Sequence, residues 1–464
     1  MIWKPNRGQT FAFATHVALL ATILLLCVAH MNAEATADPA CQIAPADYKG
    51  WHAQQISNRW VQLLVVPQNG GRLMQVTFAG HPYLFVNPKY EGQYLPPNQS
   101  KWFNYGGDKI WLLPEGNDDE QHWPGGSDVI DDGPFTFRKI SEGQHCEVEL
   151  TSPADPQSGI QFVRTIHLDA DSPRIKFHVT MKNITGHNLE WSMQSVSQYD
   201  TSISASHTRL NNDFWAFTPV NPSSRYLNRY HVRFGPAENR AVSVRDDEMF
   251  VVHYPHMAAE LWIDSAAGWL AVADGNSGFT MVERFRYEEK QPYPGHASVI
   301  FWTNGPGMKL SEDGIPSLGS DEEDDSPYYM EAEVNSPLCR LRPGESCDLD
   351  TEWFPTRGGR ELQAFSEAGI VAHPLSAMRL GNGKLKLSGS FGVFYSGRLL
   401  AHLYDEHGGN LGTMPVVDVT PTESVSLDKE ISCPDKVARL SLHLESDGVD
   451  RGSLQEVRVQ EESR

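Results

Sequence analysis

The chain has 464 residues, of which 40% are hydrophobic, and it carries a formal net charge of −21. The length exceeds that of one ordinary domain and predicts one large domain and one small one. The negative charge repels phosphate backbones, so it excludes nucleic acid as an expected partner and disfavours anionic polymers away from a local basic patch.

Residues 1–37 have the pattern of an export signal. Lys4 and Arg7 supply its positive start, residues 17–29 are apolar but short for a membrane span, and small residues follow. We expect cleavage after Ala37, with a site near Ala33 as an alternative and retention as a membrane anchor as the rival interpretation. The sequence therefore predicts a periplasmic or secreted protein that is free of the membrane after signal cleavage.

Short runs of alternating apolar and polar residues, bounded by Gly, Pro, Asn and Asp, dominate the rest of the chain. The clearest is residues 174–183, where Ile175, Phe177, Val179 and Met181 alternate with polar residues, so one face of the strand is buried. Runs of the same kind lie at 60–67, 72–80, 145–150, 160–168, 258–274, 297–304, 328–334 and 347–354. This series predicts an all-β domain of antiparallel strands over residues 45–357.

A further strand series follows a linker at residues 356–365 and predicts a small C-terminal β-sandwich, an accessory domain over residues 366–464. The acidic run 320–326 is expected to be a solvated loop, with calcium binding as the lesser alternative.

The cysteines left after signal cleavage are Cys41, Cys146, Cys339, Cys347 and Cys433. Cys339 and Cys347 flank a tight turn between two predicted strands, so we expect a disulfide between them in an oxidising compartment. The odd number forbids complete pairing within one chain. Without a C-x-x-C pair the sequence gives no support to a zinc or thioredoxin-like site, and we expect neither a metal nor a cofactor.

A segment rich in indoles, amides and carboxylates, residues 103–135, is the strongest candidate for a binding loop. Around its glycine pair lie Asn104, Asp108, Lys109, Trp111 and Glu115. Aromatic rings offer an apolar face to sugar C–H groups, and planar polar groups bracket hydroxyls, so the composition suits sugar recognition. The alternative is that Trp111 only packs a turn.

Three elements in sequence order resemble the galactose mutarotase-like, or aldose 1-epimerase-related, families. They are residues 68–88 with the Gly-Gly-Arg72 start, residues 104–111 with Gly-Gly-x-x-x-Trp, and residues 329–354 with a strand Glu followed by Leu-x-Pro-Gly-Glu. Together they span residues 50–356. The resemblance implies a large antiparallel β-supersandwich whose open concave face receives a carbohydrate.

The resemblance also implies roles for two glutamates. In the epimerases a strand Glu takes the proton of the anomeric hydroxyl and a His donates to the ring oxygen, and by motif position Glu331 matches that Glu. Strand alternation places Glu333 on the same face, and a second carboxylate raises the proton affinity of a base.

The acid of the family is missing from its expected place. Gln198 and Tyr199 occupy the strand where the resemblance implies a His, and a second family His corresponds to Tyr105. Because an amide cannot supply a proton to a ring oxygen, mutarotation by the standard mechanism is in doubt. Lys109, Tyr199, His122 and Asp108 are the candidate substitutes.

Two further segments are expected to line the same face, through Arg284 and Trp302. A guanidinium can fork to the carboxylate of an acidic sugar, although Arg284 could instead pair with neighbouring carboxylates. His253 and His256 lack the third ligand that a metal site needs.

The sequence leaves three hypotheses for this carbohydrate-binding fold, with a mono- or oligosaccharide as partner. The protein is an aldose 1-epimerase-like isomerase with Glu331 as base, a non-catalytic glycan-binding protein, or a polysaccharide lyase or glycoside hydrolase that needs two facing carboxylates. The predicted catalytic residues are Glu331, Glu333 and Lys109. The predicted substrate-binding residues are Arg72, Asn104, Asp108, Trp111, Glu115, Gln198, Tyr199, Arg284 and Trp302.

Overall fold

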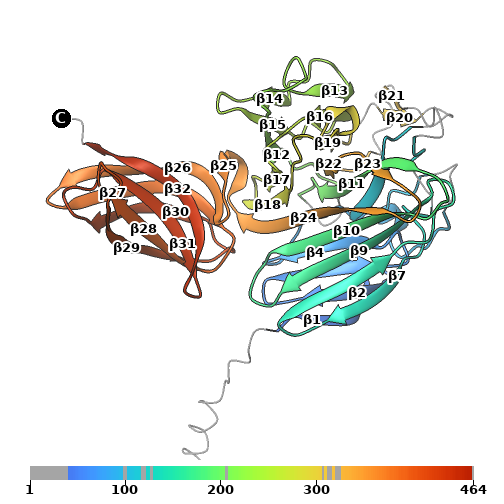
Figure 1. Cartoon of the computed structure of the whole chain (residues 1–464), viewed down its shortest axis with the longest axis horizontal. Helices are drawn as coiled ribbons and strands as arrows, with labels where there is room; N and C mark the ends of the chain where they lie inside the picture. Colours follow the sequence, from blue (N-terminus) through green and yellow to red (C-terminus); the bar gives the residue numbers. More distant parts are fainter. Residues whose placement is uncertain are drawn as a thin grey trace, which may run out of the picture.

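The computed structural model describes residues 40–97, 102–116, 122–125, 129–203, 207–305, 308–310, 316–318 and 326–461. The predicted signal segment and residues 320–325 of the acidic run lie outside these ranges. Within them the prediction of an all-β chain is confirmed, since the helical elements are short 3-10 turns: η1 (Pro88–Tyr90), η2 (Pro294–His296) and η3 (Gly359–Glu361) (Figure 1). None of the described helices has the length and apolarity needed to cross a bilayer.

The first large sheet has twelve strands, paired in the order β1-β2-β3-β4-β6-β11-β22-β19-β16-β13, with β5 beside β4 and β23 beside β11. Its strands are β1 (Gln42–Tyr48), β2 (Trp51–Ser57), β3 (Val61–Val66), β4 (Arg72–Phe78), β5 (His81–Pro82), β6 (Asp108–Leu113), β11 (Leu189–Asp200), β13 (His231–Phe234), β16 (Ala259–Ile263), β19 (Val299–Thr303), β22 (Tyr329–Asn335) and β23 (Cys339–Leu341).

The second large sheet has ten strands in the order β14-β15-β12-β17-β18-β24-β10-β9-β8-β7. They are β7 (Thr136–Ser141), β8 (His145–Thr151), β9 (Ile160–Asp169), β10 (Ile175–Asn183), β12 (Phe214–Pro219), β14 (Val242–Val244), β15 (Met249–His253), β17 (Trp269–Asp274), β18 (Phe279–Phe285) and β24 (Ser346–Arg357). β20 (Met308–Leu310) and β21 (Pro316–Leu318) pair separately.

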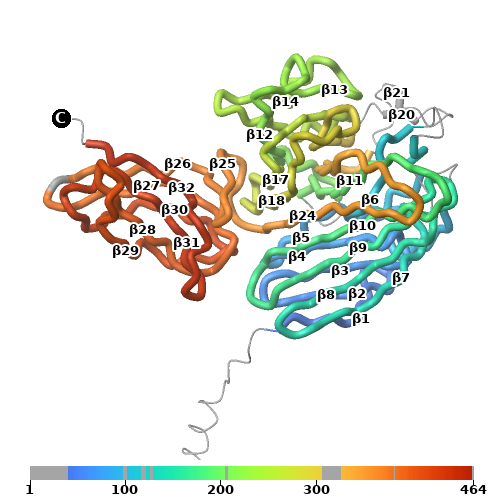
Figure 2. Tube along the Cα trace, viewed as in Figure 1, coloured from blue at the N-terminus to red at the C-terminus, as the bar shows by residue number. Residues whose placement is uncertain are grey.

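A third sheet of eight strands follows β24, in the order β29-β28-β31-β32-β26-β27-β30 with β25 beside β26. Its strands are β25 (Ala364–Phe365), β26 (Gly369–Gly381), β27 (Lys384–Val393), β28 (Gly397–Tyr404), β29 (Asn410–Val419), β30 (Val425–Ser432), β31 (Arg439–Ser446) and β32 (Val449–Glu461). Figure 2 shows this part as a separate lobe, which the chain enters after β24.

Strand alternation builds the core between the two large sheets. One cluster of buried side chains joins Val76 and Phe301 of the twelve-stranded sheet with Ile166 and Phe177 of the ten-stranded sheet. Because successive strand residues point to opposite faces, the neighbours of these inward residues point away from the second sheet. We call this outward side of the twelve-stranded sheet the open face.

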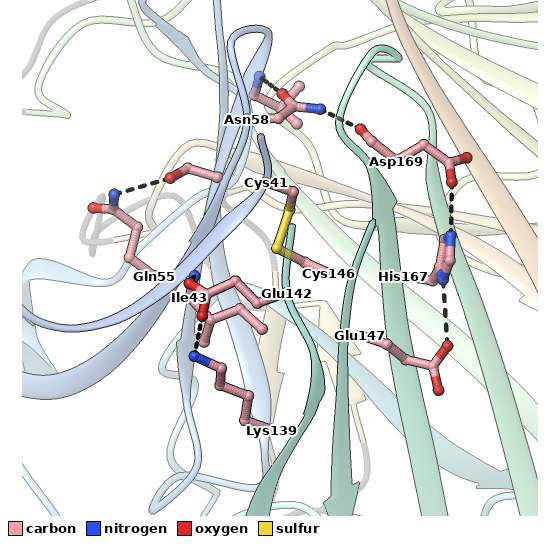
Figure 3. The surroundings of a disulfide bond; sticks show 12 residues. Cys41, Ile43, Gln55, Asn58, Lys139, Glu142, Cys146, Glu147, His167 and Asp169 are labelled. Atoms are coloured by element: carbon pink, nitrogen blue, oxygen red, sulfur yellow. Dashed lines mark hydrogen bonds and ion pairs between the residues drawn. A yellow bond between two sulfur atoms is a disulfide. The ribbon is translucent and has the colours of Figure 1, made fainter. Parts of the chain in front are cut away.

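Two disulfides brace the large domain. The predicted bond between Cys339 and Cys347 is confirmed. A second bond, which the sequence did not predict, joins Cys41 at the start of β1 to Cys146 on β8 and so ties the two large sheets together (Figure 3). Among the described residues Cys433 is the free cysteine, and it is buried in the hydrophobic cluster of the third sheet.

Candidate functional site

The candidate site is a row of side chains on the open face across four neighbouring strands. Gln198 of β11 lies opposite Glu331 of β22, Glu331 opposite Trp302 of β19, and Trp302 opposite Glu260 of β16. Residues directly opposite one another in antiparallel strands project to the same side. The chain therefore brings together four polar or aromatic groups that are far apart in sequence.

Glu331 is buried, with one hydrogen-bond donor and one cation beside it. Gln198 Nε2 donates to Glu331 Oε1 at 2.5 Å, and Lys109 Nζ lies 3.9 Å from the same oxygen. Burial raises the pKa of Glu331, whereas the charge of Lys109 and the amide of Gln198 lower it. The pKa of Glu331 is raised overall, and the ammonium and the amide oppose part of that rise.

Glu333 has a different environment two residues along the strand. Gln194 Nε2 donates to Glu333 Oε2. Burial, followed by the negative charges of Glu331 and Glu260, raises the pKa of Glu333 well above its ordinary value. Glu333 therefore holds its proton more tightly than an ordinary glutamate does, next to a second buried carboxyl group, Glu331.

Lys109 sits among indoles. Its Nζ lies 3.9 Å from the ring centroid of Trp111 and 5.3 Å from that of Trp102, a cation–π arrangement. Burial lowers the pKa of Lys109. Lys109 Nζ, Trp102 Nε1 and Gln198 Oε1 are buried without a hydrogen-bond partner in the described part of the chain, so this corner holds donors and an acceptor that a ligand can satisfy.

Arg72 and Asp131 fix the orientation of Trp111. The guanidinium of Arg72 is fully buried and donates to Asp131 Oδ1 at 2.6 Å, and Trp111 Nε1 donates to the same oxygen at 2.8 Å. Arg72 also bonds Asp132. Arg72 was predicted to contact substrate. Instead it holds Asp131, and through Asp131 it positions the indole of Trp111.

Asn104 and Trp302 meet around Tyr329 at the other end of the row. Burial raises the pKa of the Tyr329 hydroxyl, the side chains of Trp302 and Asn104 oppose that rise, and Tyr329 stacks on Phe85 with ring centroids 5.0 Å apart. Asn104 Oδ1 also accepts from the backbone of Gly106, whose φ of +91° and contact with the Phe85 carbonyl require glycine. The predicted Asn104 and Trp302 therefore lie beside Glu331.

Three predicted residues lie away from the open face: Asp108, Tyr199 and Arg284. Asp108 lies between the two large sheets, where it pairs with Arg164 of β9. Tyr199 is also between them and donates to Glu283 Oε1 at 2.5 Å. The prediction that these two line the ligand face is wrong, because each neighbours an outward residue, Lys109 or Gln198, and so points inward.

Arg284 belongs to the ten-stranded sheet rather than to the site. It pairs with Glu352 of β24 and with Glu367, which precedes β26. Arg284 therefore bridges the large domain and the third sheet. This agrees with the alternative prediction that Arg284 pairs with neighbouring carboxylates. Its predicted role at the ligand face is wrong.

Glu115 and His122 follow β6 at the edge of the site. Glu115 is exposed, and its backbone pairs with that of Trp123. His122 lines a cavity of about 480 Å³ with Trp123 and Trp191 at one end of the sandwich. No group of three or more metal-ligating side chains occurs within the described ranges.

Sequence reasoning missed Gln194, Trp102, Glu260 and Trp262. Trp262 Nε1 donates to Glu260 Oε1 at 2.5 Å, and burial raises the pKa of Glu260. The alternation in β16 contains the signal, since Glu260 and Trp262 are the outward residues of a strand whose other residues are buried.

Comparisons with known proteins give matches in structure only. No family model and no curated protein matches the chain. Similar structures include a galactose mutarotase-like protein from Lactobacillus casei, at 9% identity and a TM-score of 0.43 over 65% of this chain and 99% of that one. Another, from Clostridium acetobutylicum, has 11% identity and a TM-score of 0.43 over 68% and 99%.

A TPR-domain containing protein from Parabacteroides distasonis has 13% identity and a TM-score of 0.44 over 68% of this chain. The match spans about half of that protein, 49% of its length. At these identities and TM-scores, none of the likenesses assigns an activity to the chain.

Proposed function

We propose that the protein is exported and binds a neutral saccharide on the open face, at the row formed by Gln198, Glu331 and Trp302. The observation that supports this most is the corner around Lys109, where buried donors and an acceptor lack partners among the described residues and lie beside two indoles. A sugar ring offers C–H groups to the indoles and hydroxyls to the polar atoms.

A second candidate function is aldose 1-epimerase-like isomerisation, favoured by the contrast between Glu331 and Glu333. Glu331 accepts the proton of the anomeric hydroxyl while protonated Glu333 donates to the ring oxygen, so the C1–ring oxygen bond breaks and the open-chain aldehyde forms. Closure on the other side of the carbonyl returns both protons. Glu333 thereby replaces the family's missing His as acid.

One experiment separates binding from catalysis. Proton exchange NMR between the anomers of glucose and galactose measures acceleration above buffer, and calorimetric titration measures binding of the same sugars. We expect Glu331→Gln and Glu333→Gln each to lower the acceleration by about a hundredfold or more, and Glu238→Gln, an exposed control, to leave it unchanged.

A separate variant tests saccharide binding alone. Trp302→Ala removes a half-buried ring and should weaken binding by about tenfold. Binding without any acceleration in the wild type would reject catalysis and keep the glycan-binding function. Unchanged affinity in both Trp302→Ala and Gln198→Ala would reject the proposed site.

A further inference from the structure

A second cavity, of about 410 Å³, lies on the opposite side of the sandwich from Glu331. It is lined by Ile203, Leu210, Asn212, Asp213, Trp215, His253, Asn276 and Arg360. Phe214 and Ala216 of β12 point into the core between the large sheets, so Trp215 points outward from the ten-stranded sheet. There β12 and β17 lie near β25 at the start of the third sheet (Figure 1).

A stacked pair of rings lines this cavity. Trp215 and His253 are opposite each other on β12 and β15, and their rings stack with centroids 4.1 Å apart and planes 11° apart. The partner of Trp215 on the other neighbouring strand is Ala273, whose methyl group is too small to cover an indole. Ile203 at the rim is 45% exposed. The face of the Trp215 indole that is turned away from His253 is therefore the apolar surface offered to a ligand.

The polar rim is fixed in place without a ligand. Asp213 Oδ1 accepts from Trp215 Nε1 at 2.6 Å, and Arg360 Nη1 lies 3.3 Å from Asp213 Oδ2. Asn276 Nδ2 donates at 2.5 Å to the buried Asn211. A Cβ at position 275 would lie 2.4 Å from the Asp213 carboxylate, so Gly275 lets that carboxylate approach closely. Because these side chains are already held, little conformational entropy is lost when a ligand binds.

We propose that this cavity is a second binding site for a neutral saccharide. The Trp215 indole is about as large as a sugar ring. Amide, carboxylate and guanidinium groups surround it and together offer donors and acceptors to hydroxyls. The charges of Asp213 and Arg360 offset each other, so the rim suits a ligand without charge. The site rests on its own residues and does not depend on the function proposed for the open face.

Arg360 gives the cavity a structural consequence. It lies in η3, between β24 and the third sheet, whereas Asp213 and Trp215 belong to the large domain. A saccharide in the cavity touches both parts of the chain. Binding there stabilises the docked arrangement of the linker on the ten-stranded sheet.

Fluorine NMR of the whole chain labelled with 5-fluorotryptophan tests the proposal. Trp215→Phe identifies the resonance of Trp215, and maltose, cellobiose, lactose and chitobiose are titrated. We expect at least one of them to shift that resonance saturably. Asp213→Ala, and Arg360→Ala at an exposed side chain, should each raise the dissociation constant by roughly tenfold. Glu331→Gln should leave the Trp215 titration unchanged, which separates this site from the open face.

The contrary results are distinct. A Trp215 resonance that none of the four saccharides shifts overturns the proposal, whatever happens at the open face. So does a shift whose midpoint is the same in Asp213→Ala and Arg360→Ala as in the wild type. A proline-rich peptide is titrated in parallel, and a response to it alone would make the cavity a peptide site instead.

Discussion

Glu283 offers a sharp test of the interior electrostatics because it is a carboxyl group sealed between the two large sheets. It is fully buried, and the Tyr199 hydroxyl donates to its Oε1 at 2.5 Å. Its Oε2 has no hydrogen-bond partner among the residues that the structure covers. Burial, with added repulsion from Asp108, raises the pKa of Glu283 from 4.5 to about 8.

The sign of the pH dependence follows from this difference. Below pH 4.5 the folded and unfolded chains both hold the proton. Between pH 4.5 and about 8 the unfolded chain releases it while the folded chain keeps it, so the free energy of unfolding falls as the pH rises. The slope for one group is about 1.4 kcal/mol per pH unit, which amounts to roughly 3 kcal/mol between pH 5 and pH 7.5.

Glu283→Gln removes this titration and keeps the shape of the protonated acid. We expect the variant to match the wild type within about 1 kcal/mol at pH 5 and to exceed its free energy of unfolding by roughly 3 kcal/mol at pH 7.5. Urea denaturation from pH 5 to pH 8 at constant ionic strength measures both curves. Glu238→Gln makes the same charge change on the surface and is the control. Parallel curves for Glu283→Gln and the wild type would refute the reasoning.

Two further predictions concern stability. The Cys41–Cys146 bond closes 105 residues and the Cys339–Cys347 bond closes 8, so chain entropy predicts losses of about 4.8 and about 2.5 kcal/mol when each pair is replaced by serine; urea denaturation that ranks the two variants in the reverse order would contradict this. Arg72→Met removes the buried guanidinium that pairs with Asp131 and Asp132 and should cost roughly 3–5 kcal/mol, with partial recovery in Arg72→Lys; a melting temperature equal to that of the wild type would show that the ion pairs of Arg72 are dispensable.

Local alternation was enough to predict the fold class and part of the site. The period of two assigned the strands and placed Glu331 and Glu333 on one face, because this needs only the residues of one strand. The same rule exposes the errors. Lys109 follows Asp108 directly, so both cannot face one ligand from a regular strand.

Non-local pairing explains what the sequence could not predict. Whether a strand joins the twelve- or the ten-stranded sheet depends on partners far away in the chain, and this decides that Arg284 lies away from Glu331. The same dependence hid the bond from Cys41 to Cys146. Neither residue has a neighbour in sequence that indicates its partner in space.

The position of Lys109 decides how the open face uses its carboxyl groups. Glu331 and Glu333 are equivalent in the strand pattern, but the Lys109 ammonium lies 3.9 Å from Glu331 and its charge is the first influence that opposes the effect of burial there. For Glu333 the neighbouring charges of Glu331 and Glu260 add to the effect of burial. The two carboxyl groups therefore differ, because the pKa of Glu333 is raised well above its ordinary value whereas the charge of Lys109 opposes the rise at Glu331. For the ligand proposed above, a uronic acid would bring another negative charge beside Glu331, and Arg284 on the other sheet cannot receive it, so the charges next to Glu331 are the argument for a neutral sugar.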